Sequence, residues 1–229
     1  MLEELKARVY KENLNLVRHG LVVLTWGNVS ARDAETGLVV IKPSGVDYDT
    51  MTSDDMVVLD LDGNIIEGRL NPSSDTPTHL ELYRSFSDVG GIVHTHSTNA
   101  VAWAQAGRDI PAYGTTHADA FHGDVPCTRA LTEAEIADAY ELNTGKVIVE
   151  TFKDLDYEAV PAVLCKNHGP FTWGKTPEAA VKVAVTLEAV AEMAMKTERL
   201  AVSDARVQQY LLDKHYYRKH GEGAYYGQR

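Results

Sequence analysis

Two histidines separated by one residue carry the clearest chemical signal in the sequence. His94 and His96 stand in the segment IVHTHS, directly after two apolar residues. Because side chains alternate between the two faces of a β-strand, both imidazoles would point the same way, about 7 Å apart along the strand. Two imidazoles so arranged can bind one cation. A His-x-His pair by itself is equally compatible with a hydrogen-bonded pair on a strand surface.

Two further side chains are candidates to complete a metal site. His168 lies in KNHGP, just after an expected strand, where glycine and proline impose a turn, and Asp75 lies in SSDT. Three imidazoles and one carboxylate suit zinc or a similar transition ion and leave room for a substrate oxygen. No spacing rule connects His168 to the pair, so residue spacing alone does not place His168 in the same site.

Three short segments of small and polar residues are candidates to bind a phosphate. Glycine and serine let backbone N–H groups approach an anion closely, and the hydroxyls add donors. Each segment adjoins an expected strand and is also compatible with an ordinary turn. The chain has no P-loop motif. The segments are Trp26-Gly27-Asn28, Lys42-Pro43-Ser44-Gly45 and Pro72-Ser73-Ser74.

Candidates for proton transfer lie in two other places. The polar run TTHAD ends at Asp119, which could act as an acid/base carboxylate or lie in a solvated loop. Near the end of the chain, His215 and Arg218 are one helical turn apart and share a face. Tyr226 follows in an aromatic tail, which could pack on its own subunit or on a neighbouring one.

The elements that must position these residues indicate a mixed α/β protein. Thr76-Pro77 and Thr176-Pro177 predict helix starts, and Thr132 with Glu135 forms a capping box for a short helix. A first helix is expected to end at Gly20, and a last one to run from Ser203 to Gly221. Strands are expected over residues 22–25, 38–41, 56–61, 65–67, 91–97, 147–151 and 162–166. Asp62-Gly63 predicts a hairpin between two of them.

Composition narrows the class of protein. The 229 residues, taken as one domain over 1–229, are enough for a substantial core. The net charge of −11 argues against nucleic acid or an anionic membrane as the main partner. Two cysteines cannot form a disulfide framework and indicate free thiols. With no signal-peptide pattern and no apolar segment long enough to cross a bilayer, we expect a cytoplasmic location.

The assembled motifs resemble the L-ribulose-5-phosphate 4-epimerases of the class II aldolase and adducin-head family over essentially the whole chain. L-fuculose-phosphate aldolases of the same fold are similar around the His-x-His pair but carry Glu where Asp75 stands. Asp at this position matches the epimerases. The segments that carry the resemblance are LTWGNVSA, VIKPSGVDY, PSSDTPTHLELY, GGIVHTHS, TTHADAF, NHGPFTWGK, LLDKHYYRKHG and AYYGQ.

The resemblance implies a fold, an assembly and a metal site. The expected fold is the α/β class II aldolase fold, with a central, mostly antiparallel sheet flanked by helices in a single domain. The expected assembly is a four-fold symmetric homotetramer with the active site at the subunit interface. The metal would be Zn²⁺, with Mn²⁺ or Co²⁺ as alternatives. Its ligands would be His94, His96 and His168, with Asp75 near or on the metal.

The same resemblance implies roles in substrate binding and catalysis. The substrate would be a sugar phosphate, and Asp119 and Tyr226 would be the acid/base pair. His215 and Arg218 would line the same site, and the tail that carries Tyr226 would come from the adjacent subunit. The phosphate end would be bound by Gly27, Asn28, Ser44, Gly45, Ser73 and Ser74, with Lys42 nearby.

The implied reaction interconverts L-ribulose 5-phosphate and D-xylulose 5-phosphate. It proceeds by retro-aldol cleavage and re-addition of the bond between carbons 3 and 4. A class II sugar-phosphate aldolase that releases its products is the nearest alternative. A catalytically inactive binding domain, like the adducin head, is expected to lack the metal ligands, which are present here. L-Arabinose use and L-ascorbate use both employ such epimerases, and the sequence does not distinguish these pathways.

Overall fold

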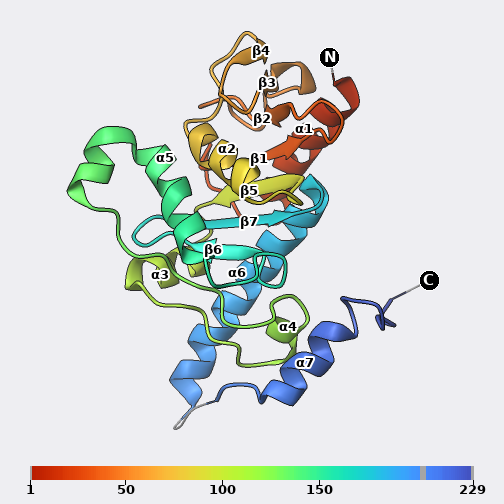
Figure 1. Ribbon diagram of the computed structural model, residues 1–229, viewed down its shortest axis with the longest axis vertical. Helices are drawn as coiled ribbons and strands as arrows, with labels where there is room; N and C mark the ends of the chain where they lie inside the picture. Colours follow the sequence, from red (N-terminus) through yellow and green to blue (C-terminus); the bar gives the residue numbers. More distant parts are fainter. Residues whose placement is uncertain (1, 202–204, 228–229) are drawn as a thin grey trace.

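A seven-stranded antiparallel sheet forms the centre of the molecule (Figure 1). The computed structural model describes residues 2–201 and 205–227. Along the sheet the strands follow the order β4-β3-β2-β1-β5-β7-β6, and every neighbouring pair is antiparallel. The predicted antiparallel sheet is therefore confirmed. The strands are β1 (Gly27–Arg32), β2 (Val39–Ile41), β3 (Val57–Leu59), β4 (Ile65–Glu67), β5 (Gly91–Thr95), β6 (Ala162–Leu164) and β7 (Pro170–Gly174).

Helices flank this sheet, and their starts follow the capping signals in the sequence. Thr176 accepts a hydrogen bond from the Ala179 N–H and precedes a proline at the first helical position. Thr132 and Glu135 form the predicted capping box. The helices are α1 (Glu3–Arg18), α2 (Thr76–Ser85), α3 (Thr98–Ala106), α4 (Thr115–Ala118), α5 (Glu133–Thr151), α6 (Pro177–Leu200) and α7 (Gln209–Tyr217), with a 3-10 turn η1 (Ser53–Asp55).

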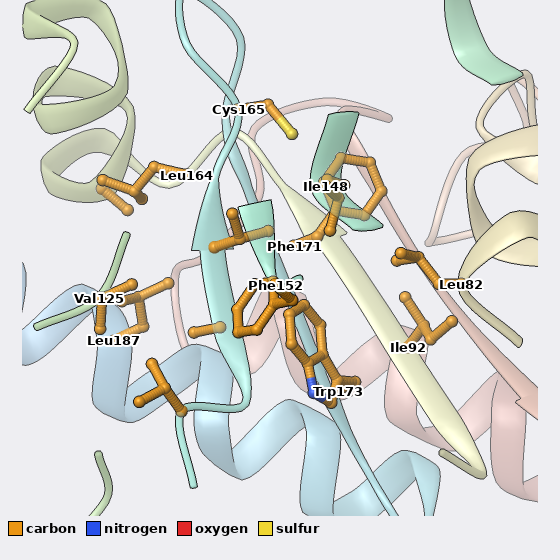
Figure 2. Close-up of a cluster of buried hydrophobic side chains, with 14 of the residues drawn as sticks. Leu82, Ile92, Val125, Ile148, Phe152, Leu164, Cys165, Phe171, Trp173 and Leu187 are labelled. Carbon is orange, nitrogen blue, oxygen red and sulfur yellow. The ribbon is translucent and has the colours of Figure 1, made fainter. Parts of the chain in front are cut away.

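Alternation along β5 assigns helices to the two faces of the sheet. Ile92 is buried in the cluster that includes side chains of α2 and α5, together with Phe171 and Trp173 of β7 (Figure 2). Its neighbour Val93 packs instead with residues of α1 and α6. Since successive side chains point to opposite faces, His94 lies on the same face as Ile92, next to α2 and α5.

The short helix α4 and the C-terminal helix α7 contact each other at the end of the molecule beyond β6, far from β4 (Figure 1). After α7 the chain folds back, and the N–H groups of Tyr225 and Tyr226 both donate to the Arg218 carbonyl. Within the described part of the chain, no helix is long and apolar enough to span a membrane.

Several expected elements are wrong or displaced. Residues 22–25 form no strand; β1 begins at Gly27, so Gly27 and Asn28 lie on a strand and not in a loop. Residues 147–151 belong to α5, which has 19 residues instead of being short. Their β-branched side chains favour a strand locally, but Val147 and Ile148 are buried on the inner face of the helix, and this packing outweighs propensity. The expected helix start at Ser203 lies outside the described residues.

Candidate metal and substrate site

Three histidines converge at the end of β5. Nε2 of His94 and Nε2 of His96 are 3.1 Å apart. One potential ligand atom from each of these residues and from His168 lies within 4.8 Å of the others. Although β5 ends at Thr95, His96 still meets His94 as the strand alternation predicts. Within the described residues, these three histidines form a group that could hold a metal ion, and they are the three histidines that the sequence predicted.

His94 is held in a fixed orientation. Its side chain is buried, and the ring stacks on Phe171 with centroids 4.3 Å apart. Its Nδ1 lies 3.0 Å from the Pro170 carbonyl oxygen. A carbonyl can only accept, so Nδ1 must carry the proton. In the tautomer protonated at Nδ1, Nε2 has a lone pair, and this is the form of histidine that binds a metal.

A tight turn between β6 and β7 brings His168 to the pair. Asn167 adopts a left-handed conformation at φ 64°, and the His168 N–H donates to the Cys165 carbonyl. Next to it, Gly169 packs so closely on the end of β5 that a Cβ there would lie 2.7 Å from the Thr95 carbonyl oxygen. This close approach, which only glycine permits, places the His168 ring centroid 4.7 Å from that of His94.

Gly169→Ala is therefore expected to force the turn away from β5. Overpacking of this kind costs about 1–3 kcal/mol, and for a chain of this size each kcal/mol lowers Tm by about 2–4 °C. Metal affinity should fall as well, because His168 moves with the turn. Thermal unfolding and metal titration measure the two effects. Gly114→Ala is the matched control, since a Cβ at Gly114 meets nothing within 4 Å. Equal Tm values for the two variants would contradict this account.

Burial disfavours protonation of the His96 and His168 imidazoles. Desolvation, followed by the neighbouring ring of His94, lowers the pKa of His96. The same causes lower the pKa of His168 to about 3. Both rings are thus unprotonated on one nitrogen at neutral pH, and that nitrogen's lone pair stays available to a cation.

Asp75 lies beside the histidines, at the start of α2. Burial by itself would raise the pKa of its carboxyl, but the proximity of His94 and His79 and a hydrogen bond from Asn28 hold that pKa below its usual value. Asn28 Nδ2 donates to Asp75 Oδ2 at 2.7 Å and to Ser73 Oγ at 3.1 Å. Asp75 is not in the group of ligand atoms within 4.8 Å, so its direct ligation of a metal stays a prediction.

One cavity unites the predicted metal and phosphate residues. It has a volume of about 360 Å³. Two of its walls are joined to each other, because the Ser44 N–H donates to the Asn71 carbonyl and the Ser73 N–H to the Lys42 carbonyl. All the predicted phosphate-binding residues line it together with Asp75 and the three histidines. The lining residues are Thr25, Trp26, Gly27, Asn28, Lys42, Pro43, Ser44, Gly45, Ser73, Ser74, Asp75, His94, His96, Tyr140, Glu141 and His168.

Lys42 supplies a buried positive charge behind one of these walls. Its Nζ donates to the carbonyls of Pro43 and Val46 at 3.2 and 2.8 Å and lies 4.8 Å from the centroid of the Tyr48 ring. Burial lowers its pKa, because desolvation disfavours the ammonium. The side chain thus holds the Ser44–Gly45 turn through the carbonyls on either side of it. Its positive charge also makes the electrostatic potential there favourable for an anion.

The remaining predicted residues form a second cluster. The Asp119 carboxylate accepts from Arg218 Nη2 at 2.8 Å, from His215 Nδ1 at 3.0 Å and from Lys219 Nζ at 3.0 Å. The Tyr226 ring lies over Arg218 and Lys219. Burial opposes ionisation of Asp119, but these donors together lower its pKa to about 2. The structure brings these predicted residues together, and none of them lines the histidine cavity of the same chain.

Besides Thr25, sequence reasoning missed Tyr140 and Glu141 of α5, which also line the cavity. Tyr140 Oη lies 3.3 Å from His168 Nδ1. Neither residue stands in a motif, and their positions depend on a break in the helix that the capping box and periodicity do not reveal.

The fold and this site define a class of protein. Residues 7–195 match the family described as "Class II Aldolase and Adducin N-terminal domain", and the chain belongs to that family. The resemblance inferred from the motifs is therefore confirmed.

Individual relatives are similar over nearly the full length. The chain is 56% identical over 228 residues to "L-ribulose-5-phosphate 4-epimerase UlaF" of Salmonella paratyphi B (strain ATCC BAA-1250 / SPB7). The aligned region covers 100% of both chains. Among solved structures, an L-fuculose 1-phosphate aldolase superposes with a TM-score of 0.80 at 26% identity, covering 94% of this chain and 95% of the other. The L-fuculose 1-phosphate aldolase from Glaciozyma antarctica PI12 has a TM-score of 0.78 at 20% identity, covering 97% and 84%, and shows likeness of fold.

Proposed function

We propose that this protein interconverts L-ribulose 5-phosphate and D-xylulose 5-phosphate as a metal-dependent 4-epimerase. The observation that carries the proposal is the convergence of His94, His96 and His168 in a cavity whose other walls are glycine- and serine-rich turns. The full-length similarity to a protein named as this epimerase supports the choice of substrate.

The donor set fits a divalent cation. Nε2 atoms of His94 and His96 face each other at 3.1 Å, burial disfavours a proton on His96 or His168, and the Nδ1 proton of His94 is already donated to Pro170. Three imidazole nitrogens suit Zn²⁺, and Mn²⁺ or Co²⁺ can take the same ligands. Asp75 would hold or neighbour the ion. When bound, the cation would supply a Lewis acid for the negative charge that develops on substrate oxygens.

The chemistry of the substrate determines what the protein must do. Carbon 4 is not adjacent to the ketone, so its proton is not acidic and cannot simply be removed. The bond between carbons 3 and 4 must break and re-form on the other face of the resulting aldehyde. Ser44, Gly45, Ser73 and Ser74 would hold the phosphate of the aldehyde fragment during this turn, with the charge of Lys42 behind them. Retaining both fragments distinguishes an epimerase from an aldolase.

Proton transfer would require groups on both faces of the substrate. One must accept the carbon-4 hydroxyl proton as the bond breaks, and another must return a proton as it re-forms. We assign these roles to Asp119, which is ionised at neutral pH, and to the phenol of Tyr226. His215 and Arg218 would orient Asp119 through the contacts described above.

An active site shared between subunits would bring the Asp119 cluster next to the histidine cavity. Asp119 and Tyr226 do not line the cavity of their own chain, and 61% of Tyr226 is exposed. We therefore propose that they enter the cavity of an adjacent subunit in a four-fold homotetramer. We also propose that residues 1–229 act as one domain, because strands from β1 to β7 belong to a single sheet. The two free thiols, Cys127 and Cys165, favour a cytoplasmic location.

Chelation is expected to abolish the reaction, and zinc to restore it. Purified protein would be incubated with L-ribulose 5-phosphate before and after treatment with a chelator, and D-xylulose 5-phosphate would be followed. Metal-dependent formation of xylulose phosphate without free glycolaldehyde phosphate supports the proposal. No xylulose phosphate from metal-loaded protein would reject it, and accumulation of free aldehyde would indicate an aldolase.

A further inference from the structure

Helix α5 is interrupted where it passes the histidine cavity. Ala139 has φ −150° and ψ 77°, values that do not belong to a helix, and helical geometry resumes directly after it. The break is stabilised by side chains. Asn143 Nδ2 donates to the Glu135 carbonyl at 2.8 Å, four residues before Ala139. From α2, Thr78 Oγ1 donates to the Glu141 carbonyl at 2.6 Å. Breaks in helices have identifiable local causes, and here hydrogen bonds fix both sides of it.

The break turns the next side chain toward the metal-binding histidines. Tyr140 is the first residue after Ala139, and its ring is partly buried between two cavities. One is the cavity of the histidines; the other, of about 180 Å³, lies between α5 and the turn after β6. His168 lines both cavities too. The Tyr140 hydroxyl lies 3.3 Å from His168 Nδ1.

The turn that carries His168 fixes its backbone but leaves the ring to be oriented by other groups. The His94 ring is oriented by Pro170, whose carbonyl accepts a hydrogen bond from Nδ1. Within the described residues, His168 Nδ1 forms its side-chain hydrogen bond with the Tyr140 hydroxyl. When Nδ1 carries the proton and donates it to the phenol oxygen, Nε2 is the unprotonated nitrogen and can bind a metal.

We propose that Tyr140 is a positioning residue that orients the His168 ring and selects its metal-binding tautomer, and that the break at Ala139 exists to place it there. This inference rests on the proposed metal site. Groups that hydrogen-bond the distal nitrogen of a metal-binding histidine change metal affinity or activity by about 10–100-fold. Tyr140 acts through His168 and is assigned no contact with the reacting atoms.

Tyr140→Phe tests the proposal, because it removes the hydroxyl and keeps the ring that separates the two cavities. The apoprotein would be titrated with Co²⁺ while the visible absorption of the bound ion is recorded, and Zn²⁺ affinity would be measured by competition with a chelator. We expect the Kd for each ion to rise by about 10–100-fold and the Co²⁺ spectrum to change. At saturating Zn²⁺ the lost kcat should return, with KM for the sugar phosphate unchanged.

Tyr157→Phe is the matched control, since its hydroxyl contacts Asp88 Oδ2 at 3.5 Å, away from the cavity. Thermal unfolding in excess chelator should give the same Tm for both variants and the wild type, which separates an effect on the metal from one on the fold. Wild-type affinity and an unchanged Co²⁺ spectrum in Tyr140→Phe would overturn the inference. Failure of the wild-type protein to bind either ion would instead reject the proposed metal site itself.

Discussion

His96→Asn is expected to remove bound metal and lower kcat by on the order of 10³-fold, because a Lewis acid contributes several kcal/mol to charge stabilisation. His96 is the most informative of the three histidines. It is the most exposed of them, whereas His94 is buried and bonded to Pro170, so a change at His94 would also disturb the fold. Asparagine is uncharged and smaller, and its amide is a poor ligand for zinc.

Metal content measured by elemental analysis and kcat measured with L-ribulose 5-phosphate would be compared for the wild type and this variant. His19→Asn makes the same change at an exposed residue just after α1 and should leave both values unaltered. A His96→Asn protein that carries no metal yet turns over at the wild-type rate would end the metal hypothesis. A protein that keeps its metal would remove His96 from the ligand set.

The histidine pair could be predicted from the sequence because strand alternation is a local property. His94 lies in β5, and two residues suffice to return to the same face, even though the strand ends between them. His168 could not be placed in this way. Its approach depends on the pairing of β7 with β5 and on the contact of Gly169 with Thr95, neither of which is encoded in residue spacing. Only the resemblance to a family placed His168 with His94 and His96.

Among the loops and helices, too, features set by local sequence could be predicted and features set by distant contacts could not. The turns at Ser44 and Ser73 were recognised by composition, and the structure shows them joined by backbone hydrogen bonds from segments about 30 residues apart. Tyr140 was not foreseen, because the hydrogen bond from Thr78 that helps to fix the helix break comes from α2. The strand expected over 147–151 failed for a related reason: burial against neighbouring elements overrode the β-propensity of valine and isoleucine.

Asp119→Asn is expected to keep bound metal and lose about 10²–10⁴-fold in kcat, the range for a missing acid/base group. The asparagine amide is nearly the same size but cannot accept a proton at neutral pH. The change also weakens contacts between α4 and α7, since Arg218 and Lys219 lose their charged partner. Asp213→Asn controls for this, because Asp213 anchors α7 by accepting from His122 Nε2 at 2.7 Å without joining the Asp119 cluster. A near wild-type rate for Asp119→Asn would remove Asp119 from the mechanism.

Hybrid assemblies of the two inactive variants can decide whether the two clusters meet across a subunit boundary. His96→Asn subunits retain Asp119, and Asp119→Asn subunits retain the histidines, so a hybrid restores a complete site where the two kinds adjoin in the right order. If co-expressed subunits mix at random in a four-fold ring, about a quarter of the sites should be complete. Activity at that level in hybrids isolated through two different affinity tags would support a shared site. Hybrids as inactive as their parents would place Asp119 outside the neighbouring cavity, and Asp119 would then have to reach the histidines of its own chain by a movement of α4 and α7.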